Sequence, residues 1–204
     1  FYALLPQYFD PQLKTMQELF RLPADFPIDP WLLVALQTVQ AVLIAPIING
    51  IFTFGEEFGW RGYLQPRLMS LGGRKTMLIM GVIWGVWHAP VIAMGHNYGL
   101  DYPGAPWLGM LAMTWFTLVS GIFLGWVTIR GGSVWPAVIG HAAINGISGL
   151  GIVAVKGEPN PLLGPLPVGI VASIGWTVAA AWIMLHPRAL NSPEPALNPP
   201  ERPA

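Results

Sequence analysis

The chain has 204 residues, of which 53% are hydrophobic and only 10% are charged. Soluble domains usually carry about 25% charged residues, so this composition cannot cover the surface of a water-soluble globule of the same size. The formal net charge is zero and there is no cysteine, which excludes an electrostatic case for nucleic-acid binding, a disulfide framework and a thiolate metal site.

The N-terminal segment, residues 1–30, mixes apolar and polar residues. Leu13, Met16 and Phe20 are spaced as on one face of a helix, which predicts a short amphipathic helix at the membrane interface. Three prolines follow and end this helix, because proline cannot donate the next backbone hydrogen bond. We therefore treat residues 1–30 as an interfacial segment.

Five apolar runs of the length that crosses a bilayer as a helix follow this segment. None of them contains Lys, Arg, Asp or Glu. An open sheet cannot satisfy its backbone in lipid, and no barrel-type alternation recurs, so we predict an all-α, polytopic bundle of about five membrane-spanning helices. The runs are residues 31–54, 76–94, 105–129, 133–155 and 162–185.

The runs form one predicted transmembrane core, residues 31–186, followed by a proline-rich tail, residues 187–204, that we expect to be disordered. If all five runs cross the membrane, six Lys and Arg residues lie on one side of it and three on the other; Arg61 is not counted. This bias predicts a cytoplasmic C-terminus. The six basic residues are Arg67, Arg74, Lys75, Arg130, Arg188 and Arg202.

Acidic residues are rare in the apolar part of the chain, yet Glu56 and Glu57 are adjacent. A charge near the bilayer centre costs about 2.5–3.5 kcal/mol, so such groups usually face the protein interior and carry function. Glu57 and Arg61 are four residues apart and can pair on one helical face, whereas Glu56 points about 100° away. One carboxylate is then free for chemistry. An interfacial Glu–Arg cluster that caps the first span would give the same pattern.

The second and fourth predicted spans carry histidine and asparagine side chains. His88 lies deep in the second span, where an isolated histidine is more often a satisfied core residue than a catalyst. His141 and Asn145 share one face of the fourth span, which also suits a hydrogen bond between helices. Together with the glutamates, they would build one pocket from three helices.

Such a pocket suggests hydrolysis. A carboxylate and a histidine can act as general base and acid on water, while a second histidine and an asparagine can donate hydrogen bonds to an oxyanion. Alternatively, zinc would activate the water if it were held by Glu56, His88 and His141. The residues alone leave both options open.

These residues resemble the motifs of the CPBP family of intramembrane proteases, which includes type II CAAX prenyl endopeptidases and bacteriocin self-immunity proteins. Residues 55–64, GEEFGWRGYL, resemble the first motif, EExxxR. Trp84 and His88 resemble the second, with Trp where Phe is more usual, and His141 and Asn145 resemble the third. The resemblance covers roughly residues 50–150. The glycine-rich first motif looks like that of the prokaryotic branch, which implies a prokaryotic plasma membrane.

The resemblance implies an intramembrane endopeptidase that hydrolyses a peptide bond of a membrane-associated or lipidated, CAAX-like substrate. Glu56 would polarise the water with help from His88. His141 and Asn145 would stabilise the oxyanion. The implied supporting residues are Glu57, Arg61 and Trp84. Family members often have further spans before the first motif, so we expect that the chain lacks an N-terminal portion.

The implied partners are membrane lipids and a membrane-associated peptide or protein, and nothing in the sequence indicates an obligate oligomer. Family members have been described both as zinc enzymes and as metal-independent glutamate-type proteases. The chain has no HExxH helix, which slightly favours water activated by Glu and His without a tightly held metal.

Two other functions fit part of the pattern. A non-catalytic immunity or scaffolding factor would use the same pocket for binding. A transporter or proton pathway would use the intramembrane Glu and His residues, but the chain shows no inverted repeat and no further charges along a path.

Overall fold

The computed structural model describes residues 30–148, 150 and 159–191. Within these ranges the regular elements are helices and no strand occurs, which confirms the all-α prediction. The predicted interfacial helix and the end of the predicted tail lie outside the described residues. The α-helices are α2 (Pro30–Val39), α3 (Ala45–Ile48), α4 (Gly50–Glu57), α5 (Gln65–Leu68), α6 (Gly73–Trp87), α7 (Ala89–Ala93), α8 (Trp107–Gly131), α9 (Trp135–Ile147) and α11 (Ile174–Leu185).

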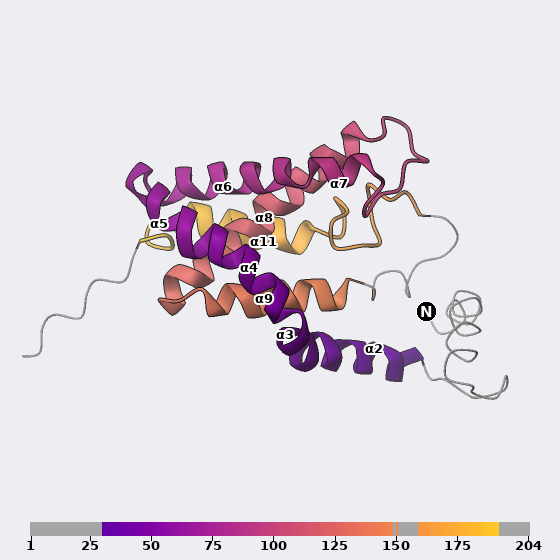
Figure 1. The fold of residues 1–204 in the computed structure, drawn as a ribbon, viewed down its shortest axis with the longest axis horizontal. Helices are drawn as coiled ribbons and strands as arrows, with labels where there is room; N and C mark the ends of the chain where they lie inside the picture. Colours follow the sequence, from indigo (N-terminus) through magenta and orange to yellow (C-terminus); the bar gives the residue numbers. More distant parts are fainter. Residues whose placement is uncertain (1–29, 149, 151–158, 192–204) are drawn as a thin grey trace, which may run out of the picture.

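The first apolar run is bent and not straight. The helical stretches Val34–Ile48 and Gly50–Leu71 meet at 65° (Figure 1). The turn falls at Asn49, which precedes Gly50, and these two residue types favour helix poorly. Two π-helical segments, η1 (Gln40–Ile44) and η2 (Phe58–Leu64), and a 3-10 turn, η3 (Met69–Leu71), interrupt the pair. The second arm, which carries the glutamates, therefore runs across α9.

Helix α8 lies at the centre of the bundle and packs against α6, α9 and α11. It approaches α6 closely because α6 presents glycines. A Cβ added at Gly81 would lie 2.6 Å from the Cα of Leu118, and one at Gly85 would lie 2.6 Å from the Cα of Thr114. Small residues that let two backbones approach are typical of helix packing in membranes. This contact fixes the end of α6 that carries His88.

Among the described residues, α8 is the one helix long and apolar enough to cross a membrane unbroken, and the bent pair would count as a second if it forms one span. Helices α6, α9 and α11 have 15, 13 and 12 residues. A straight crossing takes about 20. In the fifth run, turns replace helix before Ile174, because Pro165 and Pro167 cannot donate backbone hydrogen bonds. Five crossings stay a prediction.

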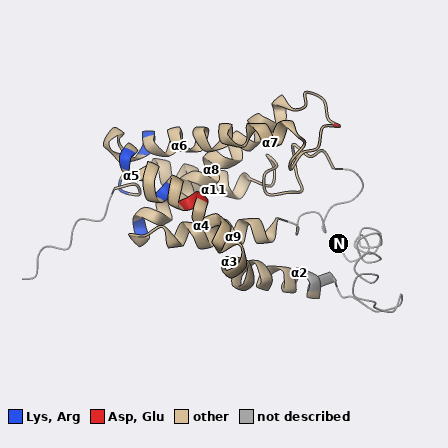
Figure 2. Ribbon diagram, viewed as in Figure 1, with Lys and Arg blue, Asp and Glu red and all other residues tan. Residues whose placement is uncertain are grey.

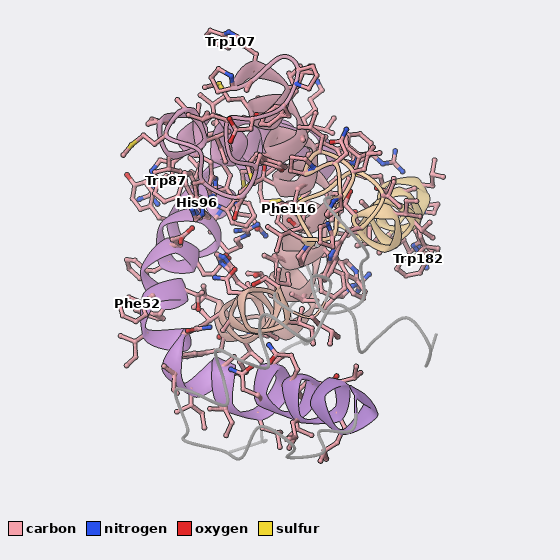
Figure 3. All side chains as sticks on the ribbon, turned by 90° about the vertical axis from the view of Figure 1, so that its right-hand side faces the viewer. Phe52, Trp87, His96, Trp107, Phe116 and Trp182 are labelled. Carbon is pink, nitrogen blue, oxygen red and sulfur yellow. The ribbon has the colours of Figure 1, made fainter. Side chains whose placement is uncertain are left out.

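The outer surface of the bundle is apolar. Ile51 and Phe52 of α4 are each 76% exposed and Leu185 of α11 is 78% exposed. Figure 3 shows Phe52 and Trp182 on the outside of the bundle and Phe116 inside it. So much exposed hydrocarbon marks a surface that contacts a non-aqueous partner, as expected for a protein in lipid.

Basic residues gather at one end of the bundle, where α5 ends and α6 begins (Figure 2). Arg130, in the last turn of α8, donates a 2.7 Å hydrogen bond from Nη2 to the carbonyl oxygen of Arg188. The first residues after α11 fold back here, since Ala189 and Leu190 are buried beside Met77. Asp101 lies in the loop at the opposite end.

Candidate active site

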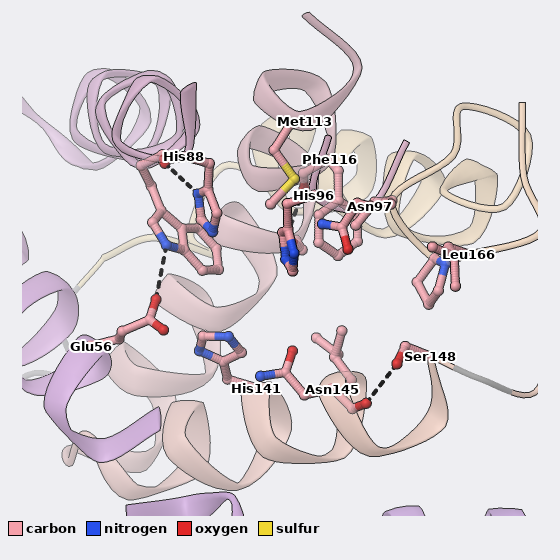
Figure 4. Close-up of a pocket in the computed structure, with 15 residues that line it drawn as sticks. Glu56, His88, His96, Asn97, Met113, Phe116, His141, Asn145, Ser148 and Leu166 are labelled. Atoms are coloured by element: carbon pink, nitrogen blue, oxygen red, sulfur yellow. Dashed lines mark hydrogen bonds between the residues drawn. The ribbon is translucent and has the colours of Figure 1, made fainter. Parts of the chain in front are cut away.

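Side chains from three helices line one cavity of about 370 Å³. Glu56 comes from the end of α4, Trp84 and His88 from the end of α6, and His141 and Asn145 from α9 (Figure 4). All four residues that the sequence predicts as catalytic therefore meet in one place. Of the three predicted supporting residues, Trp84 lines the cavity, while Glu57 and Arg61 lie behind its wall.

Glu56 is half-buried and is held by a neighbouring helix. The indole Nε1–H of Trp84 donates a 3.3 Å hydrogen bond to Oε2 of Glu56. Glu56 lies two residues before η2 begins, and such π-turns often occur at functional sites. Trp84 thus fixes the orientation of a carboxylate at a place where the helix departs from regular geometry.

Glu57 is fully buried and binds two cationic or donor groups through one oxygen. Its Oε1 lies 2.9 Å from Nη1 of Arg61 and 2.8 Å from Nδ1 of His141. The guanidinium of Arg61 stacks 4.6 Å from the Trp84 ring centre, and its Nη2 contacts the carbonyl oxygen of Gly121 at 3.4 Å. Oε2 of Glu57 and Nε of Arg61 are buried without a hydrogen-bond partner among the described residues, so these contacts compensate the ion pair only in part.

The hydrogen bonds of the two histidines fix their tautomers. His88 Nδ1 lies 2.8 Å from the carbonyl oxygen of Trp84, which can only accept, so Nδ1 carries the proton. His141 Nδ1 likewise donates to the carboxylate of Glu57. In the neutral state of each ring, Nε2 is then an acceptor. His141 can donate to an oxyanion only after it takes a second proton, and Glu57 is placed to stabilise that charge.

A second wall of the cavity was not predicted from the sequence. His96 and Asn97, in the loop between α7 and α8, line the cavity across from His141 and Asn145 (Figure 4). His96 is exposed, and it also lines the cavity. The signal in the sequence was Asn97 in a loop with Gly95 and Gly99, since Gly and Asn readily take positive φ and such loops often carry function.

Glu56 also lines a second cavity, of about 390 Å³. This groove is mainly apolar and aromatic. A Cβ added at Gly55 or Gly59 would meet nothing within 4 Å, so these glycines leave its floor open. The remaining lining residues are Trp60, Tyr63, Leu64 and Trp87.

The zinc alternative requires three converging donors. Within the part of the chain that the structure describes, no group of three His, Cys, Asp or Glu side chains could hold a metal ion. Glu57 is already bound to Arg61 and His141, and the set of Glu56, His88 and His141 does not converge as a ligand cluster. Zinc dependence stays a prediction that a chelation experiment tests.

Comparison with known proteins adds an independent finding. The family model described as type II CAAX prenyl endopeptidase, Rce1-like, matches residues 31–147, which contain all three motifs. A protein of Methanococcus maripaludis named CAAX prenyl protease 2 is 32% identical over 93 residues, or 44% of this chain and 34% of that protein. The chain thus spans about a third of this curated relative. No solved structure matches the chain.

Proposed function

The chain belongs to the Rce1-like family of type II CAAX prenyl endopeptidases, and from this premise we propose that it is an intramembrane endopeptidase acting on a membrane-associated or lipidated, CAAX-like substrate. The family consists of membrane proteases that hydrolyse peptide bonds. The observation that carries the proposal is the cavity in which Glu56, His88, His141 and Asn145 meet.

In the proposed reaction, Glu56 takes a proton from a water molecule that also donates to Nε2 of His88. The water oxygen then bonds to the carbonyl carbon of the substrate. The carbonyl oxygen becomes an oxyanion, which accepts hydrogen bonds from the Asn145 amide and from protonated His141. The C–N bond breaks, and the leaving amine takes the proton from Glu56. General-base catalysis of this kind contributes about 10²–10⁴-fold.

Glu57 supports this reaction from behind the wall. Because its carboxylate accepts the hydrogen bond from Nδ1–H of His141, it fixes the orientation of the ring that serves the oxyanion. Arg61 balances the charge of Glu57 before substrate arrives. The buried pair therefore orients His141 without touching the substrate.

The aromatic groove beside Glu56 supports a lipidated substrate. It is apolar, and it shares Glu56 with the hydrolytic cavity. A lipid chain attached near the scissile bond would lie against Trp60, Tyr63 and Trp87 while the peptide enters the polar side. The groove thus offers burial for hydrocarbon within reach of the reacting carboxylate.

The test is cleavage of a prenylated CAAX-like peptide by the purified protein in detergent or liposomes. We expect Glu56→Gln to lower the cleavage rate by about a hundredfold or more. Asp101→Asn, in the exposed loop, is the matched control and should cleave like the wild type. Full activity of Glu56→Gln would reject the mechanism. If the wild type cleaves no peptide, and a protective phenotype survives both Glu56→Gln and His88→Ala, the protein is a non-catalytic binding factor.

A further inference from the structure

The loop between α7 and α8 is folded over the hydrolytic cavity and tied to the chain opposite. The backbone N–H of His96 donates to the carbonyl oxygen of Val91 at 3.0 Å, and that of Gly99 donates to Gly95 at 2.9 Å. Tyr98 is buried and its hydroxyl donates a 2.8 Å hydrogen bond to the carbonyl oxygen of Val168. Burial raises the pKa of Tyr98, so this hydroxyl stays a donor. These hydrogen bonds and the buried tyrosine hold the loop in place as one wall of the cavity.

Asn97 holds an uncommon backbone conformation in this wall. Its φ is 65°, which non-glycine residues adopt in only a few per cent of cases. Such a conformation persists where the surrounding structure fixes it, often at ligand-binding sites. Here the hydrogen bonds of the loop and the anchor at Tyr98 provide that constraint. His96 and Asn97 therefore present their side chains at a defined place on the cavity (Figure 4).

The chemistry of this wall suits an anion. An imidazole and a carboxamide both offer N–H donors, and histidine can also carry a positive charge. The surface next to them is apolar, formed by Met113, Phe116 and Val168. Among the described residues that line the cavity, Glu56 is the one carboxylate, and it belongs to the hydrolytic side. A single anionic group between His96 and Asn97 would meet donors and no opposing charge from this wall.

A substrate of the proposed kind carries such an anion at its C-terminus. A CAAX sequence stands at the C-terminus of its protein, so the main-chain carboxylate follows the cleaved region by a few residues. Three extended residues span at most about 10 Å. One cavity can then hold both the scissile bond and the end of the chain.

We propose that His96 and Asn97 bind the C-terminal carboxylate of the substrate and so hold the short peptide that leaves on cleavage. This inference rests on the proposed function. It makes the pair a determinant of specificity: the enzyme selects chains that end a few residues beyond the scissile bond.

The test compares two peptides that differ only at the C-terminus, one a free acid and one an amide. We expect the wild type to cleave the acid with a kcat/KM at least about tenfold higher, since hydrogen bonds to a charged group are stronger than those to a neutral amide. His96→Ala should lower this ratio toward one. Asn97→Gly should lower it too, because glycine keeps the positive φ while losing the amide. The control is His186→Ala, an exposed histidine at the far end of the bundle, which should keep the wild-type ratio.

Each result bears on one proposal. Equal cleavage of acid and amide by the wild type, or an unchanged ratio in His96→Ala and Asn97→Gly, overturns the carboxylate site and leaves the endopeptidase intact. Failure of the wild type to cleave either peptide counts against the proposed function itself. The ratio is measured within each variant, so partial loss of folded protein does not alter it.

Discussion

Glu57 shows how one buried oxygen can organise a site. It accepts from Arg61 on its own helix and from His141 on α9, 84 residues away. It thereby joins the first and third motifs through a charge that never reaches the cavity. Its neighbour Glu56 turns to the cavity and is held by Trp84. Two adjacent carboxylates thus occupy two distinct environments.

Removing Arg61 should therefore unfold the protein more readily than removing Glu56. Arg61→Leu leaves the charge of Glu57 buried without its partner, which typically costs about 3–5 kcal/mol. Glu56→Gln keeps the shape of a half-buried side chain and should change stability little. Thermal unfolding in detergent would measure both. An Arg61→Leu variant that melts like the wild type would contradict the structural role of the pair.

At the scale of elements, the contact between α6 and α8 positions the second motif. Gly85 lies one turn before His88 and touches the backbone of Thr114. The helix cannot rotate or move away without carrying His88 from the cavity. Gly59, on the exposed arm, has open space instead.

These two glycines should respond in opposite ways to alanine. Gly85→Ala forces its Cβ to 2.6 Å from the Cα of Thr114, so we expect lower thermal stability and weaker cleavage. Gly59→Ala should be neutral or stabilising by up to about 1 kcal/mol, because alanine favours helix. Melting curves of the two variants make the comparison. Equal effects at both positions would show that the close approach is not what holds α6.

A larger side chain at Gly59 tests the groove. Gly59→Leu projects into the aromatic groove beside Trp60 and Trp87 without meeting a neighbouring atom at its Cβ. We expect cleavage of a prenylated peptide to fall about tenfold, the loss of roughly two buried methylene groups. Cleavage of the same peptide without the lipid serves as the reference. A parallel loss for both peptides would place the lipid chain elsewhere.

At the scale of the whole molecule, the basic end of the bundle predicts its orientation. The basic end holds Arg67, Arg74 and Lys75 together with Arg130 and Arg188. The opposite end of the bundle holds Asp101. Such a bias predicts that the basic end faces the cytoplasm. The chain has no cysteine, so a single introduced thiol reports its own position without background.

The expected result is opposite labelling at the two ends. In intact cells, a membrane-impermeant thiol reagent should label Asp101→Cys and leave Ser70→Cys unmodified until the membrane is opened. Both positions are exposed. The reverse pattern would invert the predicted topology.

A chelation experiment tests whether peptide cleavage needs a metal ion. The donors do not converge on a metal position, so we expect a strong chelator to leave peptide cleavage within about twofold of the untreated protein. Loss of activity on chelation, restored by zinc, would require the three donors to move together.

The sequence by itself determined much of this protein. Ten per cent charge and five apolar runs fixed a helical membrane protein, because lipid allows few other ways to satisfy the backbone. Rare polar residues within or next to those runs indicated Glu56, His88, His141 and Asn145, since polar groups in lipid are costly. Spacing alone also allowed Glu57 to pair with Arg61, which it does.

Other features were decided only by the tertiary structure. The contact of Glu57 with His141, the bond from Trp84 to Glu56 and the wall of His96 and Asn97 join residues that are distant in the chain. Local spacing cannot encode such contacts, because they depend on how helices cross. The bend at Asn49 and the turns before Ile174 broke two runs that hydropathy treated as continuous. Hydropathy records affinity for lipid, whereas backbone hydrogen bonding decides where a helix stops.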